Sequence, residues 1–256
     1  ISDGSSFCYK PAESETWQQY DLGYDNPLPL TIDVSPANAA YVSFDGQNDI
    51  NESPSHHIKI SQPGFDITIL PPFSQGVRRY AFFDSGAVIA GDRSLGGAGV
   101  GVSEDDFQTY LWGTGVTLQK PKYDVSAIAT FGDIAWVATS IQESYIHRVQ
   151  PDPLVVEMPG LPSSLGDPPI DGAFVSDIVV RGHEEVFRAR GRMQHDRSVQ
   201  IAGLGVFRLS DDRTNWSYVS KGFNDPDVQR LLLGPDGQTL YAATADGVYV
   251  STDLVP

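Results

Sequence analysis

Three arginines at alternate positions form one group of residues that can do chemistry. Arg188, Arg190 and Arg192 are each two residues apart, and His195 follows them closely. This spacing places side chains on one face of an extended strand, where guanidinium groups can bind a carboxylate or a sulfate through paired hydrogen bonds. Ion pairs with the surplus of Asp and Glu side chains are the alternative use of these arginines. The segment is therefore a candidate anion-binding site.

A second group lies in a polar segment that is rich in oxygen and imidazole ligands. Asp45, Asp49 and Glu52 carry the carboxylates that Ca²⁺ prefers. His56 and His57 carry nitrogen ligands that suit a transition metal. The spacing matches no established metal motif, and adjacent side chains on an extended strand point in opposite directions. A solvated polar loop is the alternative to a metal site, and the sequence indicates no other cofactor.

The chain carries no sequence motif for a familiar catalytic mechanism. It has no serine nucleophile motif with His and Asp partners, no zinc signature and no phosphate-binding glycine loop before a helix. The glycine-rich segment Gly96–Gly101 lies between predicted strands, so we expect it to form a tight hairpin. These observations favour binding over catalysis.

Composition limits the class of partner and the compartment. The chain has 33 acidic and 17 basic side chains, and its net charge of −16 repels nucleic acids and anionic membranes. No apolar run reaches the roughly 18 residues that a membrane-spanning helix needs. Cys8 is the single cysteine, so an intrachain disulfide is excluded. The first residue is Ile1 and not Met, which fits removal of a signal peptide, a longer N-terminal region or an artificial boundary, and we expect an extracellular or periplasmic protein.

The elements that must position these residues repeat along the chain. An apolar strand centre recurs every 47 to 54 residues, at Tyr41, Val88, Trp136, Phe187 and Tyr241. Short strands repeated with a period of about 40 to 50 residues are typical of β-propeller blades. The frequent Gly and Pro residues agree with many short strands joined by turns. The sequence therefore predicts one all-β domain, a propeller of about five four-stranded blades.

The five predicted blades span residues 28–70, 77–118, 122–161, 173–222 and 227–253.

The last blade lacks a fourth strand, because the sequence ends at Pro256. An N-terminal strand over 15–21, carrying Trp17, is expected to complete that blade and close the ring, which removes exposed sheet edges. Residues 7–10 resemble one further strand, so a sixth, incomplete blade is one alternative. A fragment of a larger propeller, or completion by another chain, is the other.

The turns that precede the fourth strands carry a recurring pattern. Segment 103–110 resembles the Asp-box (BNR) repeat, Ser-x-Asp-x-Gly-x-Thr-Trp, with Phe107 in place of the glycine. Its remaining motif positions are Ser103, Asp105, Thr109 and Tyr110. A shortened copy consists of Ser210, Asp212 and Trp216, and Thr16 with Trp17 keeps only the end of the motif. The Asp and Ser side chains of such turns bond nearby backbone amides, so we expect a structural role.

The resemblance implies a propeller of the kind found in sialidases, sorting receptors and photosystem assembly factors. A sialidase also needs an arginine triad, a Tyr/Glu nucleophile pair and an early Phe/Tyr-Arg-Ile-Pro segment, and Val77–Tyr80 is the nearest match to that segment. We therefore expect a non-catalytic binding or scaffolding propeller that contacts a protein or a glycan, as a secreted protein or a subunit of a larger assembly. A sialidase-like hydrolase or a lectin, with its site at the mouth of the channel, is the alternative.

Overall fold

The structure is a computed structural model in which part of the chain is described. The described residues are 6–10, 16, 18–21, 28–45, 56–62, 66–71, 77–92, 100–109, 124–140, 146–151, 154–157, 174–182, 185–191, 193–195, 199–201, 205–213, 215–224 and 226–252. Within them all regular structure is β-strand, in five antiparallel sheets of three or four strands and two short hairpins. The chain divides into two compact units, Ile1–Val77 and Arg78–Pro256, which are treated separately.

The first unit contains a hairpin and the first sheet. The hairpin consists of β1 (Ser6–Tyr9) and β2 (Gln18–Asp21), and the sheet of β3 (Leu28–Val34), β4 (Ala40–Asp45), β5 (His56–Ser61) and β6 (Asp66–Ile69). Val42, Phe44, Ile58 and Ile60 form the buried cluster of this sheet. They alternate with residues of the opposite face, as the two-residue period of a strand requires.

The second and third sheets share a core. Their strands are β7 (Val77–Phe82), β8 (Val88–Asp92) and β9 (Val100–Ser103), then β10 (Asp124–Phe131), β11 (Ile134–Ser140), β12 (Ile146–Pro151) and β13 (Leu154–Glu157). Ile89 and Val102 of the second sheet pack in one cluster with Val137 and Val149 of the third. β-Branched side chains suit such half-buried strand surfaces.

The fourth sheet packs on the other face of the third. It consists of β14 (Phe174–Arg181), β15 (Glu185–Gly191), β18 (Gly205–Leu209) and β19 (Trp216–Tyr218). Trp136 of the third sheet lies in one buried cluster with Ile178 and Leu209. A separate hairpin, β16 (Met193–His195) and β17 (Val199–Ile201), interrupts the chain between β15 and β18.

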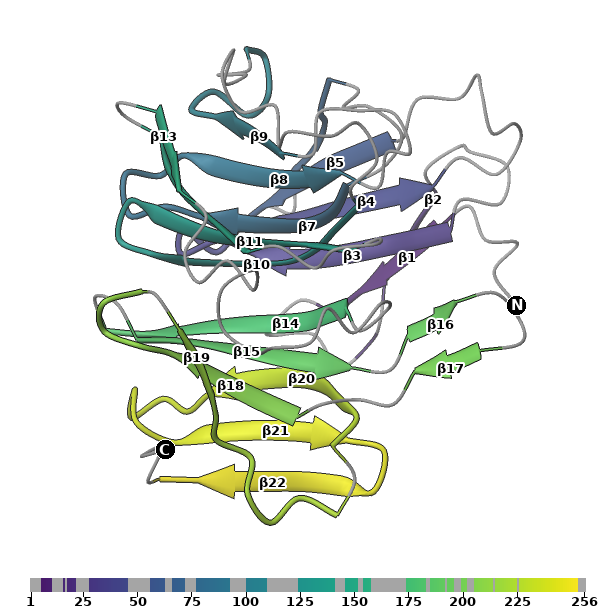
Figure 1. Cartoon of the computed structure of the whole chain (residues 1–256). Coiled ribbons are helices and arrows are strands. Elements are labelled where there is room, and N and C mark those ends of the chain that lie inside the picture. The colour runs from purple at the N-terminus through teal and green to yellow at the C-terminus, as the bar shows by residue number, and fades with distance from the viewer. Residues whose placement is uncertain are drawn as a thin grey trace. The chain divides into compact units, whose positions relative to one another are not determined.

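The fifth sheet packs on the remaining face of the fourth (Figure 1). Its strands are β20 (Val228–Leu233), β21 (Leu240–Thr244) and β22 (Gly247–Ser251). Phe187 and Val206 of the fourth sheet form a buried cluster with Leu231 and Leu240 of the fifth. The second to fifth sheets therefore pack face to face in the order of the chain.

The first strand of four sheets carries a β-bulge at its start. The register shifts lie between Pro29 and Thr31, Val125 and Ala127, Val175 and Asp177, and Val228 and Arg230. A bulge leaves one backbone position unpaired and increases the local twist. The repeated bulge indicates that these sheets share one structural plan.

The structure confirms the all-β class and the placement of the recurring strand centres. Each of the five lies in the second strand of its sheet, in β4, β8, β11, β15 or β21. Thr109 belongs to the turn after β9, and residues 110–112 lie outside the described part. Residues 18–21 pair with β1, and the predicted ring closure through Trp17 lies outside the described residues.

Candidate functional site

The turn over residues 103–109, which resembles an Asp-box, is held by local hydrogen bonds. Asp105 accepts bonds from the backbone N–H and the hydroxyl of Thr109, at 2.8 and 2.7 Å, and these donors lower the pKa of its carboxyl. The Ser103 hydroxyl donates to Asp105 and accepts the Phe107 N–H at 2.7 Å. These bonds close the turn on itself. Tyr110 lies outside the described residues.

Phe107 explains how this turn departs from the repeat pattern. Its φ is +63°, in the left-handed region where the pattern has glycine. Its side chain is fully buried, and its ring lies 6.1 Å from that of Tyr80. Burial of a large aromatic side chain offsets the strained backbone at this position.

The second turn that resembles an Asp-box has the same kind of hydrogen bonds. The Ser210 hydroxyl donates to Asp212 and accepts the N–H of Asn215 at 3.0 Å. Trp216 begins β19 and packs against the core between the third and fourth sheets. Thr16 is exposed and lies in none of the strands, and its neighbour Trp17 is outside the described part.

Arg188 lies in the interior of the fourth sheet. Its side chain is buried, and its guanidinium group lies 4.3 Å from the ring of Trp216 and 5.2 Å from that of Phe207. Stacking of this kind stabilises a desolvated guanidinium. Arg190 lies two positions along on β15, with its side chain outside the described set. These contacts therefore indicate that the side chain of Arg188 stabilises the sheet.

The remaining residues of the arginine segment follow β15 in the sequence. β15 ends at Gly191, Arg192 lies outside the described residues, and His195 ends β16 in the separate hairpin. The predicted row of Arg188, Arg190 and Arg192 is therefore described only at Arg188 and at the backbone of Arg190. The side chain of His195 is not among those described.

The predicted metal-binding segment is described only at its ends. Asp45 ends β4 and His56 begins β5, with both side chains outside the described set, while Asp49 and Glu52 fall wholly outside it. His57 is fully buried, and its Nε2 contacts the carbonyl oxygen of Pro71. In the described part of the chain no three His, Cys, Asp or Glu side chains gather to hold a metal ion.

Asp177 connects the fourth and fifth sheets, a role that the sequence did not reveal. Its carboxylate accepts the N–H of Leu231 at 2.9 Å and the N–H of Ile178 at 3.0 Å, and it lies 3.9 Å from Arg230. Burial raises the pKa of Asp177, although the two N–H donors and the positive charges of Arg230 and Arg79 lower it. Next to it, the Ser176 hydroxyl donates to the Val228 carbonyl. The bulge residues thereby join neighbouring first strands.

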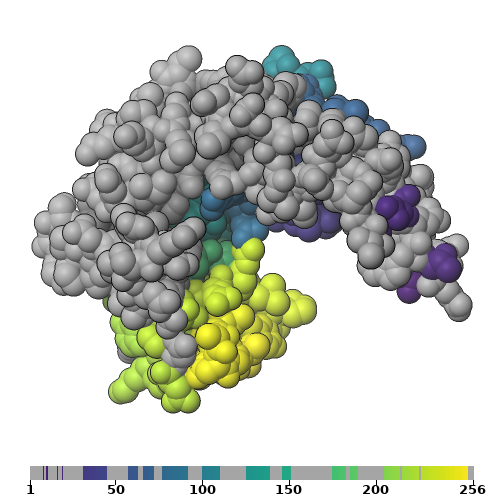
Figure 2. All heavy atoms as spheres, turned by 90° about the vertical axis from the view of Figure 1, so that its right-hand side faces the viewer, coloured from purple at the N-terminus to yellow at the C-terminus, as the bar shows by residue number. Residues whose placement is uncertain are grey.

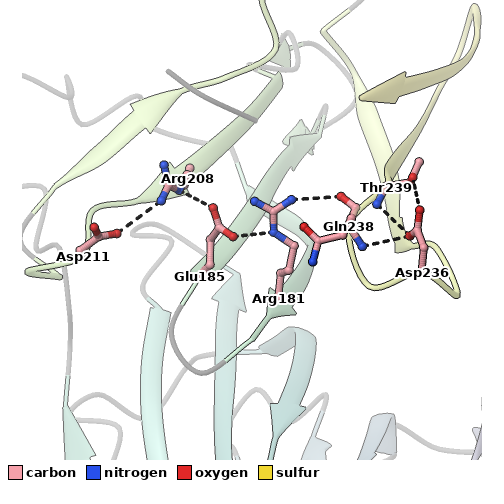
Figure 3. A network of polar contacts seen from close by, with 7 residues as sticks. All are labelled: Arg181, Glu185, Arg208, Asp211, Asp236, Gln238 and Thr239. Carbon is pink, nitrogen blue, oxygen red and sulfur yellow. Dashed lines mark hydrogen bonds and ion pairs between the residues drawn. The ribbon is translucent and has the colours of Figure 1, made fainter. Parts of the chain in front are cut away.

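A second polar network joins the same two sheets at their turns (Figure 3). Glu185 lies between Arg181 and Arg208, and Arg181 also donates to the backbone oxygen of Gln238 at 3.0 Å. Asp236 accepts bonds from Gln238 and Thr239, which lower the pKa of its carboxyl to about 2. The charges in this network therefore stabilise turns and sheet contacts.

Exposed large apolar side chains lie on the first sheet, at Ile32, Val34 and Ile69, and on the outer face of the fifth sheet. By strand register this outer face carries Arg230, Leu232, Tyr241, Ala243, Val248 and Val250. Leu232, Val248 and Val250 are 64%, 66% and 58% exposed. Tyr241 is only partly buried, whereas Trp136 and Phe187 at the same position of the third and fourth sheets are covered. Exposed apolar patches on folded proteins mark interaction surfaces.

Comparison with known proteins adds no assignment: the sequence matches no family model and no curated protein. None of the described residues belongs to a helix that is long and apolar enough to span a membrane. The outer face of the fifth sheet, with its exposed apolar side chains, is the candidate functional site.

Proposed function

We propose that this chain is a degenerate Asp-box β-propeller of about five blades in which a partner covers the outer face of the fifth sheet, and that it acts by binding, as a non-catalytic scaffold within a larger extracellular or periplasmic assembly. The packing of the second to fifth sheets supports the fold, since each covers the next in chain order. The repeated bulge in the first strands and the two Asp-box turns support the same plan.

One observation carries the binding function: the fifth sheet is covered on one face and apolar on the other. The covered face contributes Leu231, Leu240 and Ala242 to the core. The other face exposes Leu232, Val248 and Val250. A partner that covers this apolar face stabilises the complex by about 25 cal/mol per Å² of apolar area removed from water.

The charged groups of this unit support a scaffold over a hydrolase. Arg188 stacks on aromatic rings, Asp177 bonds the next strand, and Glu185 joins two arginines. A glycosidase needs two carboxyl groups about 5 to 10 Å apart and facing a substrate. Here the described acidic side chains with perturbed pKa values serve backbone amides, hydroxyl groups and sheet contacts.

The test compares two surface substitutions of the same kind. A tagged chain is returned to its source cells, and co-purified polypeptides are quantified for the wild type, Leu232→Lys and Tyr218→Lys. Leu232→Lys should remove any stoichiometric partner, because it charges the outer face. Tyr218→Lys changes an exposed residue of the fourth sheet, 48% exposed, and should retain the partner.

A parallel assay measures turnover on a panel of sialosides and other glycosides. The binding proposal predicts no turnover by the purified chain. Hydrolysis that is lost in Arg190→Ala would overturn the proposal and establish the alternative enzyme. Equal partner recovery by Leu232→Lys and the wild type would also overturn the role of this face.

A further inference from the structure

We draw no further inference here: the strongest candidate, the exposed apolar outer face of the fifth sheet in the yellow C-terminal part of Figure 2, belongs to the site already described, and nothing in the structure shows what covers it.

Discussion

The fourth and fifth sheets have the same strand plan but different surroundings. Phe187 on β15 and Tyr241 on β21 occupy equivalent second-strand positions, and both belong to faces directed away from the preceding sheet. Phe187 is fully buried because the fifth sheet covers it. Tyr241 is partly exposed, beside Leu232 and Val250.

This difference shows what a repeated strand pattern encodes. The apolar alternation specifies a sheet with two apolar faces, and burial of each face then depends on a neighbouring sheet. In the fourth sheet both neighbours are present within the same unit. In the fifth, one face keeps the composition of a covered surface, and among the described residues no other sheet of the same unit covers it.

Truncating the two equivalent aromatic residues tests this comparison most strongly. Phe187→Ala should lower the free energy of unfolding by about 4 kcal/mol, because it leaves a cavity between two sheets. Tyr241→Ala should cost about 1 kcal/mol, since its ring already contacts water. Urea denaturation of both variants measures the difference. Equal losses would show that Tyr241 is covered in solution and would break the comparison.

The pH dependence of stability that a buried histidine causes gives a second test of the comparison. His147 on β12 lies in the third sheet, which is also covered on both faces, and burial lowers its pKa to about 4. Between pH 6.5 and 4 the unfolded chain takes up a proton that the folded chain excludes, so stability falls as pH falls. The total loss is about 3 kcal/mol, from a pKa difference of about 2.5.

The variant His147→Leu should lack this part of the pH dependence. Denaturant midpoints measured from pH 7.5 to 4 should fall less steeply for the variant than for the wild type. At pH 7.5 both side chains are neutral, so the two proteins should differ much less there. An unchanged slope would show that water reaches His147 and that the third sheet is not closed over it.

Much of the strand plan could be predicted from the sequence, because apolar periodicity is a local signal. The second strands around Trp136 and Phe187 lie where the repeat places them, in β11 and β15. The bulges could not be predicted, since they depend on partners in the next sheet. Asp177 is the clearest case, because its acceptor role depends on the Leu231 N–H, 54 residues away.

The candidate site was harder to predict, because side-chain type does not fix surroundings. Arginine is a residue type that binds anions, but the guanidinium group of Arg188 stacks on the rings of Trp216 and Phe207 inside the protein. His195 lies in the hairpin β16–β17 and not in β15. Each strand of this hairpin has three residues, which is too short for an apolar period to be recognised in the sequence. The side chains of the outer face of the fifth sheet are mostly apolar, as in a buried core. Its exposure follows only from tertiary structure.

The hydrogen bond from Leu231 of the fifth sheet to Asp177 of the fourth gives the smallest of the predicted effects on stability. Asp177→Ala removes the acceptor of the Leu231 and Ile178 N–H groups and should cost about 2 kcal/mol, since buried donors are left without a partner. Asp211→Ala is the control, because Asp211 is 95% exposed in its ion pair with Arg208 and should change stability little.

The pH dependence of the same variant gives a second, independent measurement. Burial raises the pKa of Asp177 above 3.8, so the unfolded carboxyl ionises before the folded one. Stability contributed by this group therefore falls as pH rises from 3.8 to the raised folded value, and Asp177→Ala should lack that decrease. Chemical denaturation across this window measures both effects. If Asp177→Ala matches Asp211→Ala at every pH, the carboxylate does not join the sheets, and the fifth sheet is held to the fourth by its apolar face and by the bonds from Ser176 and Arg181.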